Sequence, residues 1–215
     1  MEIKNIIFDL GGVIYDIRYE NIADRFRTYG LQDFEQYYTK MSQTPMIDQF
    51  EEGLITPAEF RDYIRSISPI PLTDTQIDDA WNAILIEIPK IRWQLLGGLR
   101  IKFNNTFLFS NTNQINYDRF MAEETQKYGF NPFEVSFCKA YFSQLMHTRK
   151  PKPDGFQLII DENGLNPDET VFIDDNPANI QTAKSLGLHT YLMPKDKKLE
   201  ELFRCNLTFA EGVIQ

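Results

Sequence analysis

The chain is poor in the residues on which several common kinds of site depend. Its two cysteines, Cys138 and Cys205, stand far apart without the spacing of a metal site, and we interpret them as reduced thiols. Its two histidines, His147 and His189, are too few to indicate histidine chemistry. Residues 1–6 lack the pattern of a signal peptide, and no run reaches the ~20 apolar residues that a membrane span needs. We therefore expect a cytoplasmic protein.

Positive charge is also scarce. The 215 residues include 22 lysines and arginines against 31 aspartates and glutamates, which gives a net charge of −9. Proteins that bind nucleic acid gather Lys and Arg on one face to contact the phosphate backbone, so this balance argues against such a partner. A small phosphorylated substrate remains compatible with it, because one lysine and one metal ion can supply the local positive charge. The oligomeric state is not predictable from these features.

The first two apolar runs lie far apart in the chain. Residues 3–10 indicate a buried strand that is closed by the turn signal Gly11-Gly12, and the next such run covers residues 106–110. Helical periodicity fills the interval, over residues 21–29, 34–41, 57–66, 74–85 and 91–100. We interpret most of this interval as an insertion, a helical cap domain of residues 15–90.

After residue 105, short apolar runs alternate with helical segments. The predicted strands are residues 106–110, 140–143, 170–174 and 190–193. The predicted helices are residues 117–128, 155–163 and 178–186, of which the last two end at Gly164 and Gly187. This alternation predicts an α/β fold whose core, residues 1–14 and 91–215, contains a parallel sheet.

Reactive side chains follow the ends of three predicted strands. Asp9, Ser110 and the pair Asp174-Asp175 each come directly after or at the end of an apolar run, and Lys150 lies in a loop. In an open parallel sheet the carboxyl ends of the strands share one crevice, where ligands bind. A carboxylate, a hydroxyl, a lysine and an acidic pair that meet there suit the handling of a phosphoryl group with a divalent metal.

The acidic residues each have a functional and a plain structural interpretation. Asp9 is either a nucleophile toward phosphorus or an acid that opens a turn. Asp174 and Asp175 are costly to hold together unless a cation neutralises them, and Mg²⁺ is the natural choice. Alternatively, Asp175 or Asn176 caps the helix that begins at Pro177.

The other candidates contact substrate in the functional interpretation. The hydroxyl of Ser110 and the N–H groups around Asn111 would cradle phosphate oxygens, although Ser-Asn after a strand is also common in turns. Gly11 and Gly12 would let the backbone pass close to the substrate. Lys150 would offset negative charge, although a lysine in a loop is usually a solvated surface residue.

Taken together, the four motifs resemble those of the haloacid dehalogenase (HAD) superfamily, in the subfamily with a helical cap inserted after the first strand. The motifs are Phe8-Asp9-Leu10-Gly11-Gly12-Val13, Phe109-Ser110-Asn111, Arg149-Lys150-Pro151 and Asp174-Asp175. The resemblance covers essentially the whole chain, and residues 50–56 also resemble a common cap segment. It implies a Rossmann-like core and Mg²⁺-dependent hydrolysis of a phosphate ester, with similarity to the sugar-1-phosphate phosphatase group.

Carried over by position, the resemblance implies a role for each motif. Asp9 is the nucleophile and a metal ligand, Gly11 offers its backbone carbonyl to the metal, and Asp175, beside Asp174, ligates it. Ser110 and Lys150 bind the phosphoryl oxygens.

One position departs from the pattern of the family's phosphatases. They usually carry a second Asp two residues after the nucleophile, as a general acid and base, but this chain has Gly11. Asp16 at the entrance to the cap is a candidate replacement, or simply a surface residue. Asn179 and Lys152 also stand where an acid is common. From the cap, Glu51, Glu52 and Gln49 are candidates to face the substrate.

Three functions remain open at this point. The first is a Mg²⁺-dependent phosphatase that acts on a small phosphorylated metabolite, a sugar phosphate in our interpretation. The second is a phospho-ligand-binding or regulatory protein that kept the fold without turnover, which Gly11 makes a real alternative. The third is a 2-haloacid dehalogenase, which has no use for the acidic pair Asp174-Asp175 and usually carries a tyrosine two residues after the nucleophile.

Overall fold

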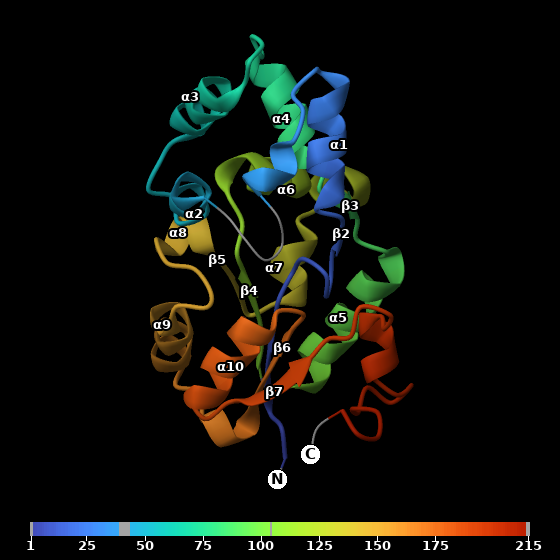
Figure 1. Cartoon of the computed structure of the whole chain (residues 1–215). Coiled ribbons are helices and arrows are strands. Elements are labelled where there is room, and N and C mark those ends of the chain that lie inside the picture. Colours follow the sequence, from blue (N-terminus) through green and yellow to red (C-terminus); the bar gives the residue numbers. More distant parts are fainter. Residues whose placement is uncertain (1, 39–43, 104, 214–215) are drawn as a thin grey trace.

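A five-stranded parallel sheet forms the centre of the computed structural model, which describes residues 2–38, 44–103 and 105–213 (Figure 1). Its strands are β1 (Asn5–Phe8), β4 (Asn105–Ser110), β5 (Lys139–Phe142), β6 (Thr170–Asp174) and β7 (His189–Leu192). They lie in the order β5-β4-β1-β6-β7, and every neighbouring pair is parallel. The predicted α/β core with a parallel sheet is confirmed. Because the chain leaves β1 in opposite directions across the sheet, the carboxyl ends of β4, β1 and β6 border one crevice.

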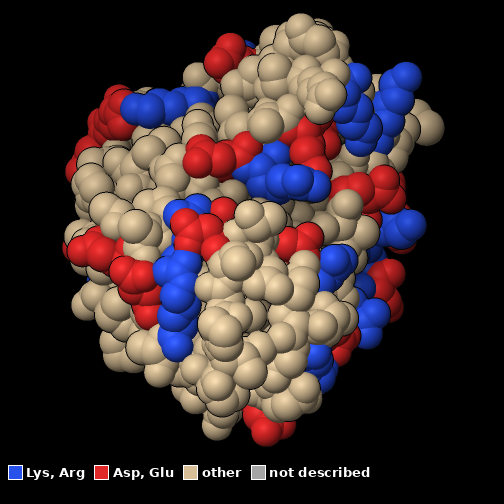
Figure 2. Space-filling model, turned by 90° about the horizontal axis from the view of Figure 1, so that it is seen from above, with Lys and Arg blue, Asp and Glu red and all other residues tan. Residues whose placement is uncertain are grey.

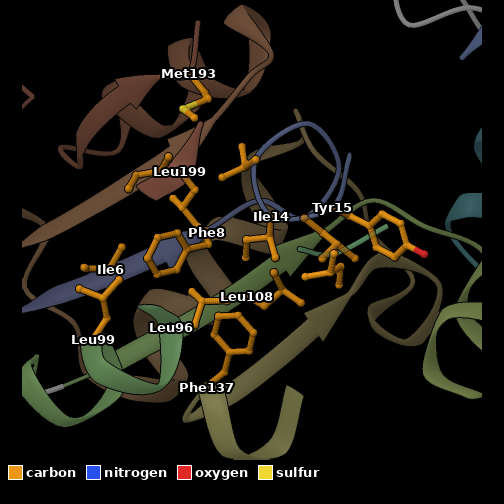
Figure 3. Close-up of a cluster of buried hydrophobic side chains, with 14 of the residues drawn as sticks. Ile6, Phe8, Ile14, Tyr15, Leu96, Leu99, Leu108, Phe137, Met193 and Leu199 are labelled. Atoms are coloured by element: carbon orange, nitrogen blue, oxygen red, sulfur yellow. The ribbon is translucent and has the colours of Figure 1, made fainter. Parts of the chain in front are cut away.

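Side chains alternate between the two faces of the sheet. Ile6 and Phe8 of β1 join one buried cluster, shown in Figure 3, whereas Ile7 joins the cluster on the opposite face. The first face is covered by α5 (Lys90–Lys102), α6 (Gln114–Tyr128) and α7 (Pro132–Ser136). The second is covered by α9 (Pro153–Asn163) and α10 (Pro177–Ser185). Burial on both faces explains why the central strands β1, β4 and β6 consist mainly of apolar residues that do not alternate with polar ones.

A block of helices lies above the carboxyl edge of the sheet (Figure 1). It contains α1 (Glu20–Thr28), the 3-10 helix η1 (Phe34–Gln36), α2 (Pro45–Glu51), α3 (Pro57–Ile67) and α4 (Asp74–Asn82). The antiparallel pair β2 (Asp16–Ile17) and β3 (Leu85–Glu87) lies where the chain enters and leaves it. Its buried cluster runs from Ile22 to Ile84 and includes Ile115 of α6. The domain boundaries at residues 15 and 90 stay a prediction.

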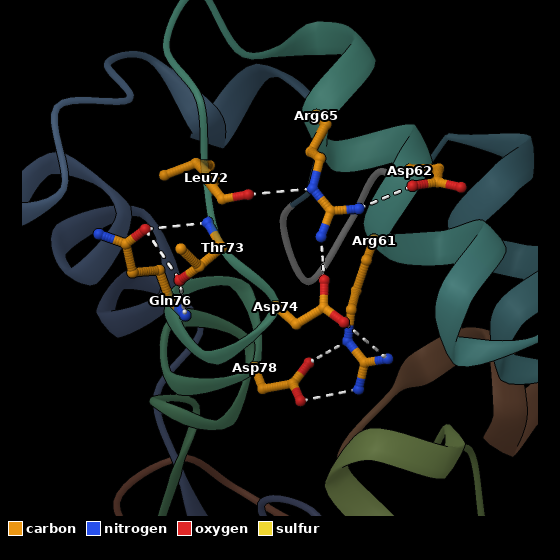
Figure 4. Close-up of polar contacts among 8 residues, drawn as sticks. All are labelled: Arg61, Asp62, Arg65, Leu72, Thr73, Asp74, Gln76 and Asp78. Carbon is orange, nitrogen blue, oxygen red and sulfur yellow. Dashed lines mark hydrogen bonds and ion pairs between the residues drawn. The ribbon is translucent and has the colours of Figure 1, made fainter.

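Polar contacts hold the upper helices of this block together (Figure 4). Arg61 of α3 donates two hydrogen bonds, each 2.8 Å long, to the carboxylate of Asp78 on α4. The start of α3 is a capping box, in which the Glu59 N–H donates to Thr56 Oγ1 and the Thr56 N–H donates to Glu59 Oε2. Both interactions fix the ends and the packing of short helices that have little propensity to form alone.

The surface of the helical block mixes charges of both signs. Seen from above, basic side chains lie beside acidic ones (Figure 2). Ion pairs in this region include Arg25 with Asp79 and Arg65 with Asp62. Within the described part of the chain, no helix has both the length and the apolar composition that crossing a membrane requires.

Several predicted boundaries are wrong. Within the described part of residues 34–41, the predicted helix is only the 3-10 turn η1. Residues 39–41 of this prediction lie outside the described residues. The helix predicted at residues 74–85 ends at Asn82, because Leu85 already pairs in β3. The prediction missed α2, α7 and the single turn α8 (Ser143–Met146). These helices are too short to show a clear 3.6-residue period.

Candidate active site

The sheet brings the predicted residues of three motifs to one edge. Phe8 of β1 lies opposite Leu108 of β4 and Ile173 of β6, so the residues that follow emerge side by side. The Asp9 N–H donates a 2.9 Å hydrogen bond to the Ile173 carbonyl, which extends the pairing to the candidate nucleophile itself. Asp9 is therefore held by the backbone of the sheet.

Lys150 reaches this edge from the loop after α8. Its side chain is only 1% exposed, which excludes a solvated surface lysine. Its Nζ donates hydrogen bonds to Asp9 Oδ1 at 2.6 Å, to the Phe109 carbonyl at 2.7 Å and to Asp174 Oδ2 at 2.8 Å. An ammonium group has three N–H donors, so each has a partner here.

The charged groups at this edge shift one another's pKa values. Burial raises the pKa of Asp9 to about 7, an effect that Lys150 opposes and that the charges of Asp174 and Asp175 reinforce. Burial by itself lowers the pKa of Lys150, but the charges of Asp174 and Asp9 raise it above its usual value, so the lysine is cationic. Lys150 pairs with Asp9 and Asp174, and a metal cation among the clustered carboxylates would stabilise their ionised forms.

The acidic cluster fits a divalent metal ion. Asp9, Asp174 and Asp175 each offer a carboxylate oxygen, and these atoms lie within 4.8 Å of one another. Gly12, at φ +81°, lies beneath Asp175, where a Cβ would stand 2.2 Å from the Asp175 Oδ2 atom. Hard carboxylate oxygens around a small space are the donors that Mg²⁺ prefers.

The two adjacent acids differ in their surroundings. Asp174 is fully buried and accepts hydrogen bonds from Lys150, from the Asn176 N–H at 2.7 Å and from Asn179 Nδ2 at 2.9 Å. These bonds orient it toward protein groups, whereas Asp175 is partly exposed and lines the cavity at this edge. Helix capping was the alternative role for Asp175 or Asn176. Asn176 caps α10, because its side chain accepts a hydrogen bond from the Ala178 N–H.

The loop after β4 forms another side of the site. Ser110 is 2% exposed and lines the cavity together with Asn111 and Gly11. The Asn111 side chain holds the Lys150 backbone, since its Nδ2 donates to the Lys150 carbonyl and its Oδ1 accepts from the Lys150 N–H. Gly12 does not line the cavity and supports Asp175 instead.

The cavity beside these groups has a volume of about 110 Å³, which suits a small molecule. Its upper wall comes from the helical block and includes Tyr19, Tyr38 and Glu51. Of the three cap residues that the sequence suggested, Glu51 lines the cavity. Glu52 forms an ion pair with Lys152, and Gln49 is exposed.

The sequence missed three residues of this wall and suggested one that lies elsewhere. Tyr19, Tyr38 and Arg149 all line the cavity, although no sequence motif assigns a role to the two tyrosines and Arg149 enters only as part of the motif around Lys150. Asp16, the suggested acid, is paired with Arg92 at 2.7 Å and does not line the cavity. The ion pair of Lys152 with cap residue Glu52 gives a structural reason for a base at that position.

Comparison with known proteins agrees with this geometry. The family model of the haloacid dehalogenase-like hydrolases matches residues 3–187. The D-ribitol-5-phosphate phosphatase of Bacteroides thetaiotaomicron is 35% identical over 190 residues, which are 88% of this chain and 91% of that protein. A HAD family enzyme of the same organism, solved in complex with magnesium and inorganic phosphate, has a TM-score of 0.85 and 38% identity, covering 94% of this chain and 100% of that one. A HAD-like hydrolase of Porphyromonas gingivalis has a TM-score of 0.82 and 34% identity, covering 92% and 94%. The chain therefore belongs to the haloacid dehalogenase-like hydrolases.

Proposed function

We propose that this protein is a Mg²⁺-dependent phosphatase that hydrolyses a small phosphorylated metabolite, a sugar or sugar-alcohol phosphate, through an aspartyl-phosphate intermediate. The observation that carries the proposal is the meeting of Asp9, Lys150 and Asp175 beside a small cavity at the carboxyl edge of the sheet. The similarity to a D-ribitol-5-phosphate phosphatase supports the substrate class. The acidic cluster weighs against a haloacid dehalogenase, which needs no metal.

Asp9 is the nucleophile in this proposal. One of its carboxylate oxygens attacks phosphorus, the bond between phosphorus and the substrate oxygen breaks, and that oxygen takes a proton from solvent water and leaves as the alcohol. Water then hydrolyses the aspartyl phosphate, which releases inorganic phosphate and restores the carboxylate. Ser110 and Lys150 bind the phosphoryl oxygens, and Lys150 also keeps Asp9 in place.

Asp9, Asp175 and the carbonyl of Gly11 would hold the metal. Bound Mg²⁺ would neutralise charge on the phosphoryl oxygens. Asp174 orients Lys150, because one of its oxygens accepts a hydrogen bond from the lysine. Residues 15–90 act as a cap domain, whose wall closes the cavity over the substrate.

Phosphate release from a panel of phosphorylated sugars, sugar alcohols and sugar acids, with Mg²⁺ or with EDTA, tests this function. We expect turnover of D-ribitol 5-phosphate or a related compound that EDTA and Asp9→Asn both remove. Folded protein that binds Mg²⁺ but releases phosphate from no compound would overturn the proposal. That result would favour a phospho-ligand-binding role.

A further inference from the structure

Glu51 brings a negative charge to the cavity wall opposite the sheet. It is the last residue of α2, it is 4% exposed, and it lines the cavity. Its Oε2 forms a 2.9 Å ion pair with Nη2 of Arg149, the residue before Lys150. The cap wall is therefore tied directly to the loop that carries the phosphate-binding lysine.

Two tyrosines extend this wall. The rings of Tyr19 and Tyr38 lie 5.5 Å apart, and both residues line the cavity. Burial raises the pKa of Tyr19 well above its usual range, and the charges of Glu51, Asp175 and Asp9 raise it further. The charges of Glu51 and of the acidic cluster therefore both act on the Tyr19 hydroxyl.

Arg149 does not make this wall positive. It pairs with Asp48 as well as with Glu51, so two carboxylates face one guanidinium. A buried wall with a carboxylate and phenol hydroxyls can accept and donate hydrogen bonds to neutral hydroxyl groups. It would repel a carboxylate group on a substrate, and that group would also lose its hydrating water on entering the cavity.

We propose that Glu51, with Tyr19 and Tyr38, binds the end of the substrate remote from the phosphate and selects a polyhydroxy alcohol over the corresponding acid. This inference rests on the proposed phosphatase function and names the substrate class that its cavity takes. The carboxylate of Glu51 attracts the alcohol, because it accepts hydrogen bonds from hydroxyl groups. It repels the acid, because it has no proton to donate to the carboxylate of that substrate.

Two substrates that differ at one carbon test the selection. D-Ribitol 5-phosphate ends in CH₂OH where D-ribonate 5-phosphate ends in a carboxylate. We expect wild-type kcat/KM to favour the alcohol, and Glu51→Gln to reduce this ratio at least about tenfold, because the like charge is removed. Glu52→Gln is the matched control, since Glu52 is the next residue and is also buried, but it pairs with Lys152 and does not line the cavity. Its ratio should match that of the wild type.

Binding of both compounds to Asp9→Asn protein, with and without Glu51→Gln, separates this inference from the proposed function. Selective binding that depends on Glu51 but occurs without wild-type turnover would overturn only the phosphatase. Turnover whose selectivity is the same in wild type and Glu51→Gln would overturn only this inference.

If Glu51→Gln fails to fold, Tyr38→Phe provides the test. This variant should lower kcat/KM for the alcohol severalfold and leave kcat/KM for the acid unchanged. An equal loss for both substrates would overturn the inference.

Discussion

Lys150 and Asp9 form a buried ion pair with 2.6 Å between Nζ and Oδ1, although the two residues lie 141 positions apart in the chain. The lysine also binds Asp174, so one side chain joins the ends of β1 and β6. The same ammonium that positions the candidate nucleophile limits the repulsion between the two acids. Lys150 therefore both positions the Asp9 carboxylate and compensates the negative charge of Asp9 and Asp174.

Asp9→Asn should remove turnover. The amide keeps the shape of the side chain but is a poor nucleophile, so we expect kcat to fall by at least about 10³-fold. Phosphate release under Mg²⁺ saturation measures the effect, with circular dichroism to show that the variant is folded. Asp16→Asn is the control, because Asp16 pairs with Arg92 and does not line the cavity. A large loss of kcat in Asp16→Asn would instead revive Asp16 as the missing acid.

Lys150→Met should destabilise the protein strongly in EDTA. Removing one partner of a buried ion pair leaves the other charge unpaired, which typically costs ~3–5 kcal/mol, and here two carboxylates lose their partner. Urea unfolding at pH 8 measures the free energy, and added Mg²⁺ should recover part of the loss. Lys4→Met removes an ion pair of the same 2.6 Å length whose side chains are partly exposed to solvent, and should change little. Equal losses in the two variants would show that burial of the Lys150 pair is unimportant.

The fold was predictable because its signals are local. The apolar runs at residues 3–10 and 170–174 mark central strands, and the polar residues that end them mark the crevice. What the sequence did not show is how the cap meets the core. The end of α2 docks on the loop of residues 147–152 through pairs between distant segments, such as Glu51 with Arg149 and Glu52 with Lys152. No local pattern encodes such contacts.

The short helices and strands of the cap were the least predictable elements. Leu85 continues a helical pattern, yet it pairs in β3 because β2 offers an edge there. Its place is decided by tertiary contact, which outweighs the weak preference of a few residues. By contrast, the capping box of Thr56 and Glu59 is a pattern that can be recognised locally, because all its partners lie within four residues.

Gly12→Ala should weaken Mg²⁺ binding. A Cβ there would stand 2.2 Å from Asp175 Oδ2 and would displace the carboxylate, and φ of +81° is unfavourable for alanine. Gly129→Ala is a matched control, because Gly129 has φ +76° and a Cβ added to it would meet no atom within 4 Å, so the substitution carries only the backbone cost of ~1–2 kcal/mol. Calorimetry should show at least about tenfold weaker Mg²⁺ binding in Gly12→Ala and unchanged binding in Gly129→Ala. Normal affinity in Gly12→Ala would remove Asp175 from the proposed ligands.

Mg²⁺ affinity should depend on pH through Asp9. Burial raises the pKa of this carboxyl to about 7, so near pH 6 most of the protein carries a proton that the metal must displace. With one such proton, binding should be about tenfold weaker at pH 6 than at pH 8 and should release close to one proton at the lower pH. Titration calorimetry in buffers of different ionisation enthalpy measures both quantities. In Asp9→Asn this proton is absent, so the affinity should be weaker and nearly constant over the same range. An affinity that is equally flat in the wild type would mean that Asp9 is already ionised at pH 6 or does not ligate the metal.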